Sequence, residues 1–365
     1  MKEKELRDKI LKEAKEILGG TGFLEVIRVF ENPTIEDERA GVGSFRPDFT
    51  IRVRLASGKA IDLLFEIKTN AQPRFVRSAV LSMSDVCGTL RNSYCILGAP
   101  YLSEASMRIC REYGIGYIDL AGNSLLKFES VFIKTEGKPN PFVSTRPLRN
   151  LFSPKSTRIL RVLLENPEQE WYVKDMAEEA KVSLGKASNV KQRLLDYEYV
   201  VEVPGQRKMK IRLTDPERLL KDWADNYSYL DNQLFKYYSL ENPREIEERI
   251  VTFCKNTGVK CALTLTSADA RLTRFLRSAA RSYIFIEKPL EPAASYLGIK
   301  EVDSGENVTM MVPYDEGVFY ALQEVDNLNI VSDIQLYLDL QGYKQRGKDA
   351  AEFLLEQRIK KKWQT

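Results

Sequence analysis

The stretch from residue 46 to 68, RPDFTIRVRLASGKAIDLLFEIK, decides how the first part of the chain folds. It predicts two strands, over 48–55 and 60–68, with Asp48 at the start of one and Glu66 and Lys68 at the end of the other. Residues two apart on a strand point to one face, so Glu66 and Lys68 lie together. Carboxylate oxygens suit Mg²⁺, and a lysine can orient a water or offset developing charge. The pattern therefore predicts a Mg²⁺ site with Asp48 and Glu66 as metal ligands and Lys68 as a catalytic partner.

Composition indicates a globular protein of two or three domains. The chain has 365 residues, which is longer than a domain with one hydrophobic core usually is. Of these residues, 43% are hydrophobic and 29% are charged, as is typical of globular proteins. No apolar run approaches the roughly 20 residues that span a bilayer. The first residues, MKEKELRDKILKEAKEIL, are charged and amphipathic, without the apolar core of a signal peptide. We expect a cytoplasmic protein with no membrane partner.

Histidine and cysteine usage narrows the chemistry. The sequence contains no histidine, which excludes histidine-dependent triads and mixed Cys/His zinc sites. Its five cysteines are scattered, and none forms a CxxC pair. They predict buried free thiols in a reducing compartment. Any hydrolysis would rest on carboxylates, lysine and a metal.

The first segment, residues 1–140, predicts the element order α-β-β-β-α-β-α-β. A helix over 3–17 precedes strands over 23–30, 48–55 and 60–68. A helix from Pro73 to about residue 90 follows, then a strand over 93–99, a helix capped by Ser103 and a strand over 115–120. Two interpretations of Asp119, Gly122 and Asn123 stay open, namely a turn that needs positive φ and a polar edge of the site. Residues 137–156 contain several prolines and predict a linker.

This segment resembles the PD-(D/E)xK nuclease superfamily. The resemblance rests on Pro47, Asp48, Glu66 and Lys68, with 17 residues between the two carboxylates, and on the element order. It implies a restriction-endonuclease-like αβββαβ fold in which Asp48 and Glu66 bind the metal and Lys68 positions the water. Family members often add a carboxylate from the first helix or strand, for which Glu13 and Glu25 are candidates. Three alternatives stay open: nuclease chemistry, a fold that only binds nucleic acid, and ordinary surface acids.

The second segment, residues 154–226, predicts a winged helix-turn-helix. Three helices precede a hairpin made by YVVEVP, the tip GQRK and MKIRLT. Residues 181–212 hold eight Lys or Arg against three acids, a local charge of +5, which favours double-stranded DNA as partner over a role in protein contacts alone. On the third helix Ala187, Val190 and Leu194 form the core stripe. The predicted DNA-binding residues are Lys186, Ser188, Asn189, Gln192, Arg193, Arg207, Lys208 and Lys210.

The third segment, residues 240–365, predicts a mixed α/β domain. Its stretches CALTLTSADARLTRFLRSAARSYIFIE and VSDIQLYLDLQGYKQRGKDAAEFLL look like the AbiEi antitoxin family of type IV toxin–antitoxin systems. The family signature here consists of Asp333, Gln335, Leu336, Tyr337, Asp339 and Leu340. The resemblance implies a transcriptional autorepressor and a nucleotidyltransferase-like toxin as partner. Ser267-Ala268-Asp269 suggests nucleotidyltransferase chemistry in the chain itself, but the Gly-Ser pair that would hold a triphosphate is missing.

Three functions follow for a multidomain chain of α/β and α+β class. The first is a DNA-binding transcriptional regulator of the AbiEi type with a nuclease-fold domain. The second is a Mg²⁺-dependent DNA endonuclease that its winged helix targets. The third is a toxin-neutralising protein that binds no DNA. These sequence patterns do not determine the oligomeric state, for which a dimer is one option.

Overall fold

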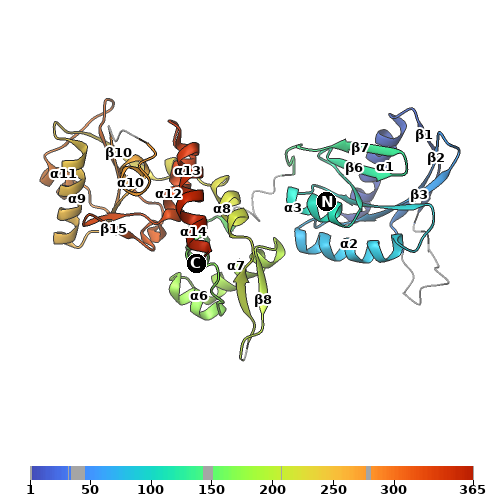
Figure 1. Cartoon of the computed structure of the whole chain (residues 1–365), viewed down its shortest axis with the longest axis horizontal. Coiled ribbons are helices and arrows are strands. Elements are labelled where there is room, and N and C mark those ends of the chain that lie inside the picture. Colours follow the sequence, from blue (N-terminus) through green and yellow to red (C-terminus); the bar gives the residue numbers. More distant parts are fainter. Residues whose placement is uncertain are drawn as a thin grey trace. The chain divides into compact units, whose positions relative to one another are not determined.

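The computed structural model describes residues 2–31, 33, 46–142, 151–206, 208–276 and 281–364. The protein is a multidomain α/β chain, as predicted. It divides into two compact units, Met1–Ser144 with Asp196–Glu198, and Thr145–Leu195 with Tyr199–Thr365 (Figure 1). No described helix is both long and apolar enough to cross a membrane.

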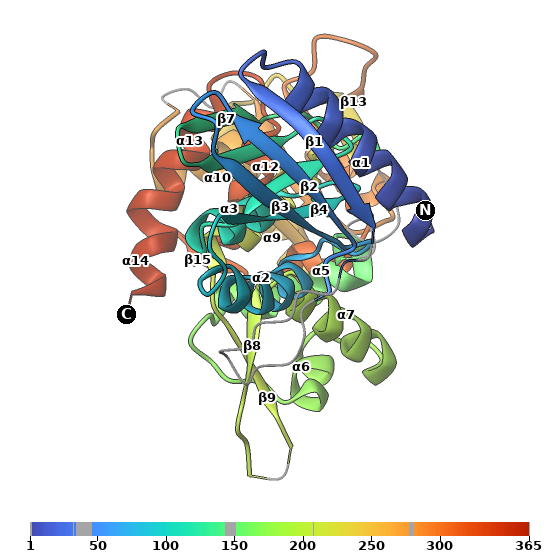
Figure 2. The same ribbon diagram turned by 90° about the vertical axis from the view of Figure 1, so that its right-hand side faces the viewer.

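The first unit is built on a seven-stranded sheet with strands in sequence order β1 to β7. Strands β1, β2 and β3 are antiparallel, β3, β4 and β5 are parallel, and β5, β6 and β7 are antiparallel. Figure 2 shows β1, β2 and β3 side by side. The elements are α1 (Glu3–Gly19), β1 (Leu24–Glu31), β2 (Phe49–Leu55), β3 (Ala60–Ile67), α2 (Pro73–Cys87), β4 (Ser93–Ala99), α3 (Glu104–Glu112), β5 (Gly116–Asp119), β6 (Ser124–Phe128) and β7 (Val131–Thr135).

Strand β3 is buried on both faces, which explains its nearly continuous apolar sequence. Leu63, Phe65 and Ile67 belong to the core cluster that contains the apolar stripe of α1. Leu64 points the other way and packs in the cluster that contains residues of α2 and α3. Gly98 on β4 allows this close fit, because an added Cβ would lie 2.4 Å from the Ile67 side chain and 2.9 Å from Ile10.

The second unit begins with three helices and an antiparallel hairpin, which we call the helix–hairpin segment. Ala187, Val190 and Leu194 of its third helix are buried, as predicted, and Ser183 Oγ accepts the Lys186 N–H at 3.2 Å. In Figure 2 the hairpin extends beyond α6 and α7. The elements are α5 (Pro154–Glu165), α6 (Val173–Glu179), α7 (Leu184–Asp196), β8 (Val200–Val203), β9 (Lys210–Leu213) and α8 (Pro216–Ala224).

The rest of the second unit is a mixed seven-stranded sheet in the order β13-β10-β14-β12-β11-β16-β15, with helices packed against it. Its strands are β10 (Gln233–Tyr238), β11 (Cys261–Leu263), β12 (Ser282–Ile286), β13 (Lys300–Glu301), β14 (Val308–Val312), β15 (Gln323–Val325) and β16 (Leu328–Ile330). Its helices are α9 (Pro243–Thr257), α10 (Leu265–Leu272), α11 (Glu291–Leu297), α12 (Asp333–Gln341), α13 (Gly347–Leu354), a π-helical turn (Leu355–Ile359) and α14 (Lys360–Trp363), with short 3₁₀ turns at Tyr229–Asp231 and Glu316–Phe319.

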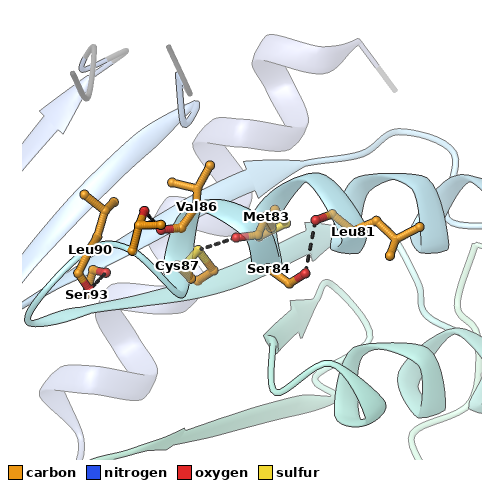
Figure 3. The surroundings of a disulfide bond; sticks show 9 residues. Leu81, Met83, Ser84, Val86, Cys87, Leu90 and Ser93 are labelled. Atoms are coloured by element: carbon orange, nitrogen blue, oxygen red, sulfur yellow. Dashed lines mark hydrogen bonds between the residues drawn. A yellow bond between two sulfur atoms is a disulfide. The ribbon is translucent and has the colours of Figure 1, made fainter. Parts of the chain in front are cut away.

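The cysteine prediction is wrong at one pair. Cys87 and Cys95 form a disulfide with Cα atoms 6.2 Å apart, and Figure 3 shows the surroundings of Cys87. Cys110, Cys254 and Cys261 are free and buried. The pair closes the short connection from the last turn of α2 to β4. Cys95 lies eight positions after Cys87, so no local motif marks the pair, and only the folded connection brings them together.

Candidate metal site and nucleic-acid interface

The structure brings Asp48, Glu66 and Lys68 together at the end of β3. Asp48 lies one residue before β2, and its backbone N–H donates to the Phe65 carbonyl at 2.9 Å. One carboxylate oxygen, Oδ2, accepts the Ile67 backbone N–H at 2.7 Å. Glu66 and Lys68 share a face of the strand, and Lys68 Nζ donates to Glu66 Oε1 at 2.6 Å. The predicted trio is therefore a real cluster, held by the β2–β3 pairing.

A cavity of about 450 Å³ opens beside this cluster, lined by Glu66 and Lys68, the loop after β3, α2 and Glu3 at the start of α1. Burial raises the pKa of Asp48, and the nearby Glu3 charge raises it further, against the lowering effect of the Ile67 N–H and Lys68. The Glu66 side chain is 20% exposed and that of Lys68 is 38% exposed. The cluster is thus shielded but reachable from solvent.

The donor set fits Mg²⁺ better than a cation with an all-protein shell. Across the described ranges, no three Asp, Glu or Cys side chains cluster tightly enough to hold a metal ion on their own. Mg²⁺ usually keeps several waters and takes one or two carboxylates. Glu66, which lines the cavity, and Asp48, which lies beside it and accepts the Ile67 N–H, would supply those two.

The third acid lies elsewhere than the sequence indicates. Glu25 of β1 is committed to an ion pair with Arg54 at 2.9 Å, and Glu13 is not part of the cavity lining. Glu3 is the acid that lines the cavity and acts on Asp48. The signal that marks it is its place at the first turn of α1, since the parallel β3–β4 pair ends under that helix terminus.

The second polar cluster of the first unit is a turn. Asp119 is fully buried and accepts the backbone N–H groups of Leu102, Ala121 and Asn123 within 3.0 Å. Gly122 has φ of 93°, a conformation that favours glycine. The positive-φ turn interpretation is confirmed, and Asp119 has no capacity left for a metal.

Helix α7 presents the side chains predicted to meet DNA. Ser188, Asn189 and Gln192 are exposed, on the side opposite the buried core stripe. Lys186 is half-buried and its Nζ donates to Ser153 Oγ at 3.3 Å. Burial lowers the pKa of Lys186, and the charges of Arg193 and Lys155 lower it further. Lys186 in the first turn of α7 thus lies within electrostatic reach of Arg193 in the last turn and of Lys155 in α5.

The hairpin cations differ in how they are held. Lys210 pairs with Glu170 at 3.4 Å and lies 5.2 Å from the centre of the Tyr172 ring. Lys208 is exposed at the tip, and Arg207 lies outside the described residues. Lys191 of α7 pairs with Glu202 of β8 at 2.6 Å. Glu202 is already subtracted in the local charge of +5, whereas Glu170 lies outside residues 181–212 and offsets one further positive charge.

The α12 signature forms a buried polar network that joins the two parts of the second unit. Gln335 and Asp339 are fully buried. Asp339 accepts from Tyr227 and Thr264 at 2.5 Å each and from Gln335 at 2.9 Å. Arg161 of α5 donates to Gln335 and stacks 4.8 Å from the Trp223 ring centre. The polar side chains of the signature, Gln335 and Asp339, therefore connect α5 and the segment after α8 to the α/β domain.

The Ser267-Ala268-Asp269 stretch is structural. Ser267 Oγ accepts the Tyr283 N–H at 2.9 Å, and Asp269 accepts from Thr273 and from the Leu276 N–H. All three residues are buried in α10. The Asp269 carboxylate accepts hydrogen bonds that close the turn after α10. It is therefore not available as a catalytic carboxylate in this stretch.

Comparison with known proteins defines the class of the α/β domain. Residues 212–360 match the family model described as "Transcriptional regulator, AbiEi antitoxin, Type IV TA system". The matched residues lie in the second unit and make up less than half of the chain. This part of the chain is similar to AbiEi antitoxins, which confirms the resemblance predicted from the α12 signature.

Two solved structures are also similar to parts of the chain. The structure of EndoMS in apo form is 18% identical over 33% of this chain and 46% of its own, with a TM-score of 0.19. An EndoMS–dsDNA complex is 18% identical over 32% of this chain and 44% of its own, with a TM-score of 0.20. The chain thus spans less than half the length of either match. No curated protein matches the sequence.

Proposed function

We propose that the protein is a DNA-binding transcriptional regulator of the AbiEi antitoxin type that carries a nuclease-fold domain. The observation that carries this proposal is the junction inside the second unit. The family match begins at residue 212, within β9 of the hairpin, and Arg161, Gln335 and Asp339 join the two parts through buried contacts. The helix–hairpin segment and the antitoxin domain thus act as one body.

The helix–hairpin segment supplies the DNA contacts in this proposal as a winged helix. Ser188, Asn189 and Gln192 are side chains of the types that read base edges in a major groove. Lys186, Lys208 and Lys210 would contact phosphates, as would Arg193 and Arg207. Phosphate contacts position the protein, whereas the exposed polar face of α7 would select the sequence.

The test is binding of the full chain to the DNA immediately upstream of its own gene. Fluorescence anisotropy should show binding that an Asn189→Ala/Gln192→Ala variant weakens about tenfold or more, since each good base contact contributes about 1–3 kcal/mol. Gln169→Ala, another exposed amide in the same segment, serves as matched control and should bind like the wild type. Equal binding by both variants would contradict base reading by α7.

The partner in this proposal is a nucleotidyltransferase-like toxin encoded beside the gene. Co-expression of the chain with the product of the adjacent gene should relieve the growth arrest that this product causes. Size-exclusion chromatography of the purified chain gives its oligomeric state. If growth arrest persists when the chain is co-expressed, the chain is not the antitoxin of that toxin. This outcome would leave the DNA-binding proposal unaffected.

A Mg²⁺-dependent endonuclease is the second candidate function, favoured by the convergence of Asp48, Glu66 and Lys68 beside a cavity. In this alternative the two carboxylates hold Mg²⁺, and Lys68, kept in place by Glu66, orients the attacking water. Supercoiled plasmid with Mg²⁺ should be nicked by the wild type and not by Lys68→Ala. Lys59→Ala, which removes an exposed lysine paired with Glu129, should cleave normally. Intact plasmid in every case would favour the regulator alone.

A further inference from the structure

A polar pocket lies inside the second unit, where the end of α5 faces the C-terminal helices. Its volume is about 560 Å³, within the range of roughly 300–1,000 Å³ that small-molecule sites occupy. It is lined by Glu165, Ala321, Leu322, Gln323, Ser332, Asp333, Gln357, Arg358 and Lys362. Two acids and two cations therefore face one space, which has no role in DNA reading or in the metal site.

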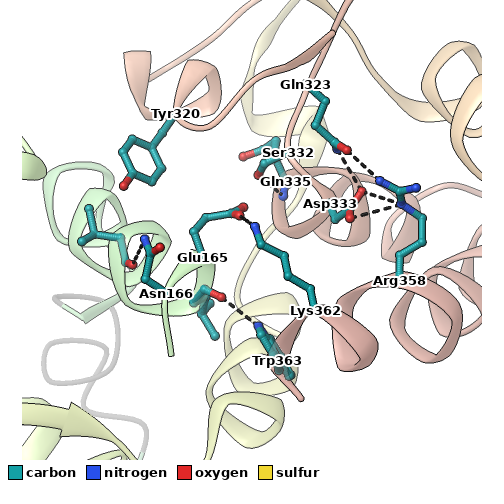
Figure 4. A network of polar contacts seen from close by, with 12 residues as sticks. Glu165, Asn166, Tyr320, Gln323, Ser332, Asp333, Gln335, Arg358, Lys362 and Trp363 are labelled. Carbon is teal, nitrogen blue, oxygen red and sulfur yellow. Dashed lines mark hydrogen bonds and ion pairs between the residues drawn. The ribbon is translucent and has the colours of Figure 1, made fainter. Parts of the chain in front are cut away.

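The cationic wall of the pocket is fixed in position. Arg358 Nε donates to both oxygens of Asp333, at 3.0 and 3.2 Å, and its Nη2 donates to Gln323 at 2.7 Å (Figure 4). Gln323 in turn donates to Asp333 at 2.9 Å. Within the described residues, Arg358 Nη1 has no such acceptor. The Nε and Nη2 groups of Arg358 are thus engaged with protein acceptors, and Nη1 is left to donate to a ligand.

The acidic wall carries an unsatisfied group. Glu165 is the last residue of α5, and its side chain is only 6% exposed. Lys362 donates to one oxygen, Oε2, while Oε1 is buried with no hydrogen-bond partner among the described residues. Leaving such an acceptor unpaired costs about 1–3 kcal/mol.

The polar neighbours of Glu165 are already engaged elsewhere. Figure 4 shows Asn166, Trp363 and Tyr320 around it. Asn166 donates to the Val162 carbonyl at 3.4 Å, Trp363 to the Leu164 carbonyl at 2.8 Å, and Tyr320 to Glu179 at 2.9 Å. Glu165 lines the pocket, so a donor on a molecule held there would satisfy Oε1.

We propose that this pocket binds a small zwitterion with an ammonium and an acid group, of which a free amino acid is the simplest form. The ammonium would donate to Glu165 Oε1, and the acid would accept from Arg358 Nη1 and Lys362. A ligand of zero net charge suits a wall of two acids and two cations, because it leaves no charge uncompensated. The proposal is independent of the proposed function and adds a small-molecule site to it.

The site has a geometric consequence for the regulator. Glu165 belongs to α5, which also carries Arg161 into the α12 network, whereas Arg358 and Lys362 belong to the C-terminal helices. A bound zwitterion would therefore bridge the helix–hairpin segment and the antitoxin domain. It binds the native chain and should raise its melting temperature.

The experiment is a thermal-shift screen of the full chain against the standard amino acids, one at a time, followed by calorimetric titration of those that shift it. At least one should bind with a one-to-one stoichiometry. Glu165→Gln keeps the shape but removes the charged acceptor, and Arg358→Met removes the acid-binding edge. Each should weaken binding about tenfold or more, since hydrogen bonds to charged groups contribute about 1.5–3 kcal/mol.

Three controls make the result decisive. Glu170→Gln, which lies outside the pocket lining, should bind like the wild type. Acetate and methylamine, which carry one charged group each, should bind at least about tenfold more weakly than the amino acid. The proposal is overturned if no amino acid binds, if both pocket variants bind like the wild type, or if acetate alone binds as tightly.

Discussion

The cluster of Asp48, Glu66 and Lys68 in the first unit and the network of Arg161, Gln335 and Asp339 in the second use the same chemistry, a carboxylate near a cation, to different ends. The first stays reachable, with Glu66 20% and Lys68 38% exposed. The second is sealed, with Gln335 and Asp339 fully buried. The two groups of residues differ more in solvent accessibility than in residue type. The accessible cluster can bind and release a ligand, whereas the buried network connects two parts of the fold.

The energetic reason is desolvation. Water and a metal can compensate a half-buried carboxylate, so its partners can change. A sealed charge depends on the few groups around it, and removal of one partner leaves the other uncompensated. Substitutions should therefore have large effects on stability in the network and small ones in the open cluster.

The largest effect is expected for Arg161→Ala. The change removes the donor to Gln335, the stacking on Trp223 and the buried positive charge that offsets Asp339, so we expect a loss of about 3–5 kcal/mol in unfolding free energy. Urea denaturation measures it. Arg52→Ala, whose ion pair with Asp62 is half-exposed, is the matched control and should lose at most about 1 kcal/mol. Similar losses at both sites would break the comparison.

The next effect is a pH dependence that Asp339 creates. Burial raises the pKa of Asp339 to about 6, whereas its unfolded value is about 3.9. Between these values the native state holds more protons than the unfolded state, so the unfolding free energy falls as pH rises, by up to about 3 kcal/mol in total. The contribution is fully present below about pH 4 and lost above about pH 6.

Asp339→Asn removes this titration and tests it directly. The wild type should lose stability relative to the variant from pH 4 to pH 7, as measured by urea denaturation at several pH values. A difference between the two proteins that stays constant across that range would contradict a sealed, ionisable Asp339.

The smallest effect is expected for Asp48→Asn. Burial raises the pKa of Asp48, so its charge is a cost at neutral pH, while the amide oxygen can still accept the Ile67 N–H. The variant should therefore unfold within about 0.5 kcal/mol of the wild type or be slightly more stable. Its affinity for Mg²⁺, followed by calorimetry, should fall at least about tenfold. Loss of stability without loss of Mg²⁺ binding would assign Asp48 to the structure instead.

Much of the fold follows from local sequence patterns. The alternation in 48–55 and 60–68, the Ser103 cap and the stripe of Ala187, Val190 and Leu194 are all found as predicted. The alternation and the stripe are visible in the sequence because each strand or helix buries a face of its own.

The elements and contacts that the sequence did not reveal depend on tertiary packing. The short strands β6 and β7 extend the sheet beyond β5, and α8 begins at Pro216 with Asp215 as its N-cap. Glu3, the first residue of α1, lines the same cavity as Glu66 and Lys68, a contact that depends on how α1 packs on the sheet. Gln335 and Asp339 belong to the family signature, but the sequence does not indicate that they are buried or that Gln335 contacts Arg161, more than 170 residues away in the chain.

The most direct test of a DNA-reading regulator is the salt dependence of its binding to the DNA upstream of its own gene. Anisotropy titrations of the full chain without Mg²⁺, from low to physiological salt, should show a log–log slope of several units, because each phosphate contact contributes about 0.9 to the slope. Lys208→Ala should reduce the slope by about one. A flat salt dependence would contradict the account and favour a protein that neutralises its toxin without binding DNA.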